Sequence, residues 1–472
     1  NLARHEEAMN QFLVVIDYTG TEQAAKSGYG RQVLKEAQRD LVMAYSSLPD
    51  GSPESAIRVC KAISPDGYMD LAIKLAEGYA SQGDFQKSTR LYKNIIAEYA
   101  SRPDAWKVVQ FQREIFENVY RAAVKKEVVE EARRLIGLLD KFRAVAPKDQ
   151  IQPELVRVEE LIRVVATTYH NEARKTMEDA TLEFTHHLYN EYLRLFPDAE
   201  KSFTILYNYA LLLQDIGKFE LAAERFSQVV AARPSDPLAD DAAHAAVSAY
   251  HKLLENQPNR AKSEDTTDTE PKEIPEFEQK LIAASDTYLK MAKPDSPNVV
   301  ETRFVRAMAY YKYNHFEEAA AGFTDIISRD PDHVNAPDAA RLLLSSLALM
   351  RDIPRLNAAV DTIQVQPALM TGEVPEIIRK INERKDFNAC FEFEKKGQYS
   401  RAAECFLAYV AKFQSTPLKD SALINAANNF FKARRVEDSL KVNEQLVNEF
   451  PNSDLGKRAL YNIADTYRRL AV

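Results

Sequence analysis

The sequence predicts an all-α protein built from a series of helical hairpins, and three observations support this prediction. Glycine is scarce, at 13 of 472 residues, while hydrophobic residues make up 45% and charged residues 28%. Such a chain can bury apolar helix faces and keep a solvated surface. A ten-residue pattern recurs in one frame, at 83–92, 217–226, 314–323 and 397–406. Proline follows two of these windows at the same distance, at Pro234 and Pro331.

Each window reads as the turn and second helix of a hairpin. In 217–226, the turn residue Gly217 precedes the aromatic Phe219 by two, and Ala222 and Phe226 follow on one helix face. The later proline stops the second helix. The preceding helix keeps the frame, with a small residue nine positions before the turn aromatic and a large one six before it. These pairs are Ala76 and Tyr79, Ala210 and Leu213, Ala307 and Tyr310, and Cys390 and Phe393.

The other elements are more degenerate. Residues 105–145 have long apolar periodicity and predict longer or irregular hairpins. A weaker unit ends at Pro197, another covers 336–364, and another ends at Pro451. Ala464 and Tyr467 begin one more unit. The chain starts at Asn1 rather than Met and ends in a helix with no following partner, so we expect a fragment of a longer protein.

One segment interrupts the pattern. Residues 256–275 are polar, mostly acidic and flanked by proline, between expected helices at 237–254 and 276–291. We interpret them as a mobile loop that expands the turn of one repeat. The loop is either a passive insertion or an acidic docking segment for a basic partner. The expected organisation is a helical array over 1–255, the loop over 256–275 and a second array over 276–472.

The recurring frame resembles the tetratricopeptide repeat, a helix-turn-helix unit of about 34 residues. The resemblance implies a right-handed superhelical solenoid of tetratricopeptide-like hairpins, some of them degenerate, whose first helices line a concave binding groove. The positions that line the groove in the family correspond here to residues that include Leu211, Ile424 and Asp465. The candidate partner-binding residues are Tyr207, Leu211, Phe304, Met308, Tyr311, Phe387, Phe391, Asn428, Phe431 and Tyr461.

This groove is mainly apolar and aromatic, which suits helices or peptide segments of other proteins. Each of these side chains either faces the groove or packs against the next repeat. Family members that bind chaperones use Lys and Asn there to hold a C-terminal carboxylate. No unit of this chain has a Lys or a Lys/Asn pair at those positions, so we reject an Hsp70/Hsp90 co-chaperone role.

Residues 449–467 and 194–203 are similar to bacterial envelope tetratricopeptide proteins, such as outer-membrane assembly lipoproteins and cell-division coordinators. The resemblance implies a protein-protein interaction scaffold of the periplasm or cell envelope, in a complex such as a motility or assembly machine. Two alternatives remain open. One is a cytosolic adaptor that senses a peptide, and the other is the repeat arm of an enzyme whose catalytic part lies outside this chain.

Motifs and charge argue against other functions. The net charge of −8 disfavours nucleic-acid binding, and no apolar run is long enough to span a membrane. No GxxxxGK[ST], GxSxG or HExxH motif occurs. The adjacent His186 and His187 cannot chelate one ion in the HExxH manner. We therefore predict no enzyme activity in this chain, no cofactor and no metal.

The three cysteines, Cys60, Cys390 and Cys405, are too few and odd in number for a disulfide framework. Cys390 and Cys405 could meet across a hairpin, but we expect small buried thiols. They do not indicate a compartment.

Overall fold

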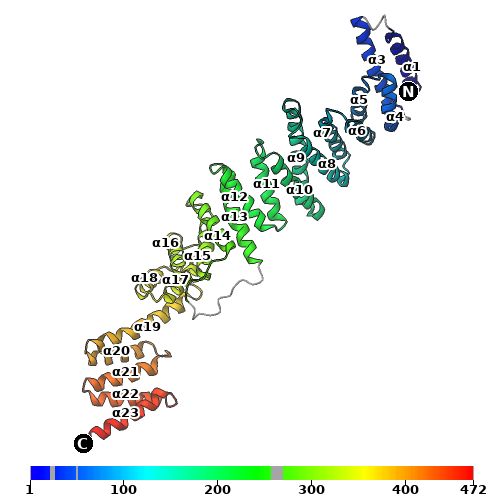
Figure 1. Ribbon diagram of the computed structural model, residues 1–472. Helices are drawn as coiled ribbons and strands as arrows, with labels where there is room; N and C mark the ends of the chain where they lie inside the picture. Colours follow the sequence, from blue (N-terminus) through cyan, green and yellow to red (C-terminus); the bar gives the residue numbers. More distant parts are fainter. Residues whose placement is uncertain (1, 22–26, 49–50, 257–268, 471–472) are drawn as a thin grey trace. The chain divides into compact units, whose positions relative to one another are not determined.

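The computed structural model describes residues 2–21, 27–48, 51–256 and 269–470. The described residues form α-helices, one short 3-10 helix and no β-strand. They divide into two compact units, Asn1–Ala249 and Tyr250–Val472, each of which is considered separately. Within each unit consecutive helices pack side by side as hairpins (Figure 1). The predicted all-α hairpin fold is confirmed.

In unit 1, α9 packs on α10 and α11 on α12, as α5 does on α6 and α7 on α8. The elements are α1 (Leu2–Thr19), α3 (Gly28–Ser46), α4 (Pro53–Ile63), α5 (Tyr68–Ser81), α6 (Phe85–Tyr99), η1 (Ala105–Lys107), α7 (Val108–Arg121), α8 (Lys125–Phe142), α9 (Lys148–Thr176), α10 (Asp179–Leu195), α11 (Ser202–Asp215), α12 (Phe219–Ala232) and α13 (Pro237–Glu255), which continues into unit 2. The longer or irregular hairpins expected over 105–145 are one hairpin of α7 and α8, whose second helix has 18 residues against 14 in α12.

In unit 2, α15 packs on α16, α17 on α18, α19 on α20 and α21 on α22. The elements are α14 (Glu276–Met291), α15 (Val299–Lys312), α16 (Phe316–Arg329), α17 (Ala336–Leu349), α18 (Ile353–Gln364), α19 (Val374–Lys395), α20 (Tyr399–Lys412), α21 (Lys419–Lys432), α22 (Val436–Glu449) and α23 (Asp454–Leu470). The weak unit expected over 336–364 is therefore a complete hairpin.

The turn within each clear hairpin follows directly from the recurring frame. The turn residue adopts a left-handed conformation, with φ of 73° at Gly217. The aromatic two positions later is the first residue of the second helix. The backbone N–H of Lys218 donates to the carbonyl of Leu213 at 2.8 Å, which closes the end of α11. Equivalent bonds join residues 84 and 79, 315 and 310, and 398 and 393.

Among the described residues, four hairpins have a left-handed turn residue other than glycine or asparagine. Ala123, Met177, Arg351 and Arg434 have φ of 57°, 52°, 57° and 61°, each two residues before a second helix. An L-residue pays a steric penalty in this conformation because its Cβ approaches the backbone carbonyl. These turns are therefore points where the chain loses stability that glycine would restore.

We predict that Ala123→Gly stabilises unit 1 and that Gly217→Ala destabilises it, each by about 1 kcal/mol. A Cβ added at Gly217 would meet no heavy atom within 4 Å, so only the backbone conformation is penalised. Urea unfolding of each variant, followed by the fluorescence of the single tryptophan in unit 1, measures both changes. Equal stability of the two variants would contradict this account.

The small and large residues of the frame form the hairpin cores. Ala76, Ala210, Ala307 and Cys390 have no exposed surface, and neither do Phe226, Phe323 and Phe406. Small residues allow the two helices to approach closely. At the α15–α16 crossing, a Cβ built on Gly322 would lie 2.8 Å from the Cβ of Ala307. Positions nine before and six after the turn aromatic therefore face each other across the hairpin.

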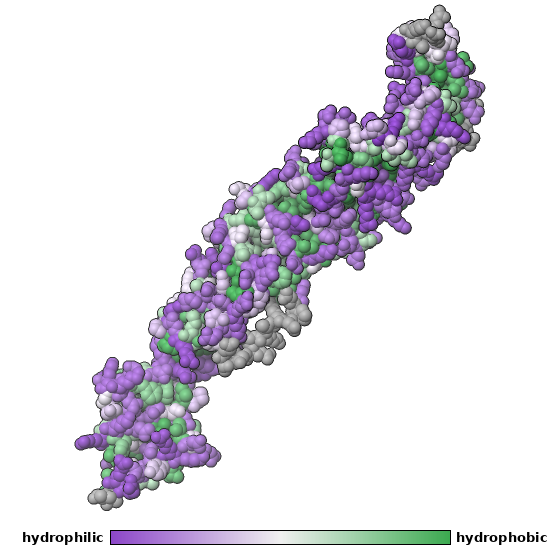
Figure 2. Space-filling model, viewed as in Figure 1, coloured by the Kyte–Doolittle hydropathy of each residue, from purple (hydrophilic) through white to green (hydrophobic). Residues whose placement is uncertain are grey.

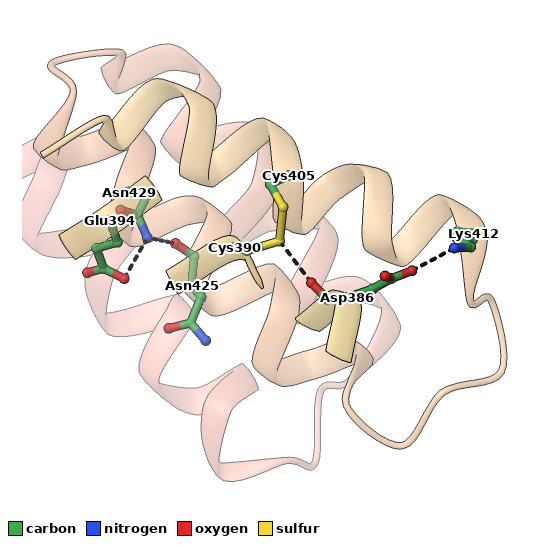
Figure 3. Close-up of a disulfide and its surroundings, with 7 residues drawn as sticks. All are labelled: Asp386, Cys390, Glu394, Cys405, Lys412, Asn425 and Asn429. Carbon is green, nitrogen blue, oxygen red and sulfur yellow. Dashed lines mark hydrogen bonds and ion pairs between the residues drawn. A yellow bond between two sulfur atoms is a disulfide. The ribbon is translucent and has the colours of Figure 1, made fainter. Parts of the chain in front are cut away.

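Cys390 and Cys405 occupy these facing positions in the α19–α20 hairpin and form a disulfide, so the expectation of free thiols there was wrong. Their Cα atoms are 5.5 Å apart. Figure 3 shows the disulfide joining the two helices, with the Asp386–Lys412 ion pair at 2.6 Å nearby. Cys60 is a buried free thiol, as expected. Burial raises the pKa of the Cys60 thiol to about 12.

The expected acidic loop is described only in part, because residues 257–268 lie outside the described residues. Its last residues contact the α15–α16 turn. The N–H of Lys272 donates to the carbonyl of Tyr313 at 2.9 Å, and the side-chain amide of Asn314 donates to the carbonyl of Glu270 at 2.9 Å. The described end of the loop is thus bound to the next hairpin.

Candidate functional site

The ten predicted groove residues lie on the first helices of their hairpins, and none of them is fully buried. Phe431 and Tyr461 are the most open, with 38% and 70% of their surfaces exposed. The other eight are partly exposed. Ile424, which shares the frame position of the groove residues, is buried at 5% exposure and is not accessible. Asp465 pairs with Arg468 and Arg469 of its own helix.

The aromatic members also pack against the second helix of their own hairpins, a contact that neither of the two expected placements included. Tyr207 contacts Phe226, and Phe304 contacts Phe323, with ring centroids 6.0 and 5.9 Å apart. Phe387 and Phe391 both contact Phe406. These contacts hold one edge of each ring against the second helix. The rest of each ring remains partly exposed.

Phe304 and Met308 of α15 line a cavity of about 220 Å³ in unit 2. Leu281 of α14 and Val305 of α15 add to its apolar lining, which also includes charged side chains. The cavity is lined by His251, Glu278, Leu281, Glu301, Phe304, Val305, Met308, Ala309, Lys312 and Asn335. Glu278 also accepts a hydrogen bond from the hydroxyl of Tyr313 at 2.7 Å. An apolar cavity of this size with a polar rim can hold one large aliphatic or aromatic side chain.

Phe391 lines a second and wider hollow, of about 700 Å³, over α19, α20 and α21. Its walls are Asn388, Phe391, Glu392, Glu394, Lys395, Tyr399 and Lys432. Lys432 pairs with Glu394 at 2.5 Å, and this pairing lowers the pKa of the Glu394 carboxyl. Asn429 donates to the same carboxylate at 3.3 Å (Figure 3). The hollow therefore combines an aromatic floor with a fixed ion pair.

The predicted residues do not form one continuous pocket. Phe304 and Met308 share one cavity and Phe391 lines another, while the other seven residues line neither. The sequence did not identify the charged residues of the cavity lining, Glu278, Glu301 and Lys312, because Glu278 comes from a different helix. On the face seen in Figure 2, hydrophobic residues are exposed in small groups between hydrophilic ones. This arrangement suits several anchor points rather than one deep site.

The described residues contain no group of three or more His, Cys, Asp or Glu side chains placed to hold a metal ion. Among the described helices, none is both long and apolar enough to cross a membrane.

No family model matches the chain, and no curated protein matches it. Solved structures similar to it include a tetratricopeptide repeat protein from Parabacteroides merdae, at 13% identity and a TM-score of 0.28, covering 63% of this chain and 97% of that one. The apo form of RapI has 12% identity and a TM-score of 0.26, covering 86% and 96%. PilW, a type IV pilus biogenesis factor, has 14% identity and a TM-score of 0.23, covering 63% and 98%.

These likenesses are too distant to carry an argument, so the fold assignment depends on the hairpins themselves. Small residues at the helix crossing, a left-handed turn residue and a second helix that begins at the turn aromatic recur in one frame in both units. The chain has the all-α fold of a tetratricopeptide-like helical repeat protein.

Proposed function

We propose that this chain is a non-catalytic scaffold that binds segments of other proteins along the first-helix face of its hairpins. The observation that carries the proposal is the cavity formed by Phe304 and Met308. A partly exposed aromatic ring and a flexible thioether beside an apolar cavity provide the contact surface that anchor side chains need. The partner is therefore a helix or an extended peptide with at least one large apolar side chain.

We further propose that the scaffold belongs to a bacterial envelope complex, such as a motility or assembly machine. The Cys390–Cys405 disulfide supports this location, because structural disulfides persist in oxidising compartments such as the periplasm and are rare in the cytosol. The similarity of residues 449–467 to envelope tetratricopeptide proteins points in the same direction.

Photo-crosslinking in cells tests both the proposed binding surface and the proposed envelope location. A photoreactive phenylalanine analogue is placed at Met308 or Phe391, and the control position is Val365, which is 72% exposed and lines neither hollow. We expect Met308 and Phe391, but not Val365, to capture partner proteins of the envelope. We also expect Met308→Lys to weaken binding of the captured partner about tenfold.

Equal capture from all three positions would contradict the groove proposal. Capture of cytosolic proteins alone would leave the groove in place and overturn the envelope location. It would favour the cytosolic adaptor instead.

A further inference from the structure

A stripe of cationic side chains follows α3 in unit 1. Arg31, Lys35 and Arg39 are spaced four residues apart on one face, and all three are exposed. Lys74 of α5 lies beside them. Together they line an open hollow of about 450 Å³, whose walls are Gly28, Arg31, Gln32, Lys35, Glu36, Arg39 and Lys74. We refer to this surface as the α3 stripe.

Three cations of the α3 stripe have no carboxylate partner among the described residues. Many Lys and Arg side chains elsewhere pair with a neighbouring carboxylate, as Lys61 does with Glu98. Lys35, Arg39 and Lys74 form no ion pair with any described residue. Glu36 is the one carboxylate in the lining, and it accepts a hydrogen bond from the amide of Gln32 at 3.1 Å. The hollow therefore has a surplus of positive charge.

The spacing of the stripe matches an extended peptide. Residues four apart on an α-helix are separated by about 6 Å along the axis. Side chains on one side of an extended chain repeat every second residue, at about 6.6 Å. An extended segment that lies along α3 with an acidic residue at every second position would meet successive cations of the stripe. A helical segment with acids in the same alternating order would present them on different faces.

The chemistry of the lining favours a peptide over a nucleic acid or a lipid headgroup. Glu36 can only accept hydrogen bonds when ionised, and a peptide backbone offers an N–H at each residue. A phosphodiester or phospholipid phosphate offers only acceptors and therefore has no donor for Glu36. Binding of single-stranded nucleic acid also relies on aromatic stacking surfaces, and the lining residues include no aromatic side chain.

We propose that the α3 stripe binds an extended, alternately acidic segment of a partner protein. This surface is separate from the aromatic first-helix face of the proposed function, because it recognises charge and spacing rather than an apolar anchor. Binding here does not depend on Phe304, Met308 or Phe391. A partner that uses both surfaces would gain avidity from the two contacts.

The test is fluorescence polarisation of the full chain with two labelled peptides of equal composition. In one, glutamate alternates with serine, and in the other the glutamates form one block. We expect the alternating peptide to bind more tightly, with affinity that falls as salt increases. The triple variant Lys35→Gln, Arg39→Gln, Lys74→Gln is expected to bind it about tenfold more weakly or worse.

The matched control removes the same charge from another exposed surface, with Arg384→Gln, Lys385→Gln and Lys396→Gln in unit 2. It should bind the alternating peptide as the wild type does, and Lys35→Arg with Lys74→Arg should also retain binding. The proposal is overturned if the triple variant binds like the wild type, if the control loses as much affinity, or if the block peptide binds equally well. Tighter, stripe-dependent binding of a single-stranded oligonucleotide or of phosphatidylserine vesicles would also overturn it.

Discussion

Replacing Arg113 by leucine is expected to reduce the free energy of unfolding of unit 1 by about 3–5 kcal/mol. Arg113 lies on α7 and is only 7% exposed. Its guanidinium donates to the carboxylates of Glu154 on α9, of Glu114 at 2.7 Å and of Glu117 at 3.4 Å. Glu154 is also 7% exposed. Leucine would leave this carboxylate buried beside only Arg157, whose nearest nitrogen is 3.8 Å away.

The fluorescence of Trp106 reports this change, because the single tryptophan of the chain lies in η1, directly before α7. Arg121→Leu is the control. Arg121 also contacts Glu117, but its side chain is 56% exposed, so its loss should change the free energy of unfolding by less than about 1 kcal/mol. A second replacement, Glu154→Leu added to Arg113→Leu, should recover part of the lost stability because the most deeply buried carboxylate of the cluster is then removed as well.

The loss of unfolding free energy caused by Arg113→Leu should also depend on pH. Burial raises the pKa of Glu114 above its ordinary value even with Arg113 present. A carboxyl with a raised pKa in the folded state is stabilising when protonated, and that contribution is lost as pH rises through the folded pKa. Arg113→Leu should therefore be less damaging at mildly acidic pH than at alkaline pH. If Arg113→Leu lowers the free energy of unfolding as little as Arg121→Leu does at every pH, the buried ion cluster adds no stability.

The hairpin fold could be predicted because each structural requirement selects a residue type. A left-handed turn selects glycine or asparagine, as at Gly217 and Asn314, and close helix crossing selects alanine, as at Ala307. Where another residue adopts the left-handed conformation, as Ala123 does, the sequence lacks the usual turn residue. The hairpin is then harder to predict. The α7–α8 hairpin was missed as a regular unit for this reason.

The disulfide was also within reach of the sequence. Cys390 stands nine positions before its turn aromatic and Cys405 six after it, the positions at which Ala307 and Gly322 approach in another hairpin. Counting cysteines alone does not show that these positions face each other. The charged residues that line the cavity beside Phe304 could not be predicted in this way, because Glu278 comes from α14. Its placement depends on how successive hairpins pack, which the repeat frame does not specify.

Loss of the disulfide is expected to reduce the free energy of unfolding of unit 2 by about 3 kcal/mol. The two cysteines are 15 residues apart, and closing a loop of that length removes a large part of the conformational freedom of the unfolded α19–α20 segment. Thermal unfolding followed by circular dichroism compares the wild type with Cys390→Ala, Cys405→Ala. The wild type should lose this stability in dithiothreitol, and the double variant should not respond to it.

Cys60→Ala is the matched control, because it removes a cysteine but keeps the disulfide, and its response to dithiothreitol should equal that of the wild type. The bridged helices supply Phe387 and Phe391, and the end of α19 reaches α21 through Glu394, Asn429 and Lys432. The disulfide therefore stabilises the helices that form the surface proposed to bind partners. This stabilisation is present only where the two cysteines are oxidised. Free thiols at both positions in protein alkylated inside cells would contradict the envelope location.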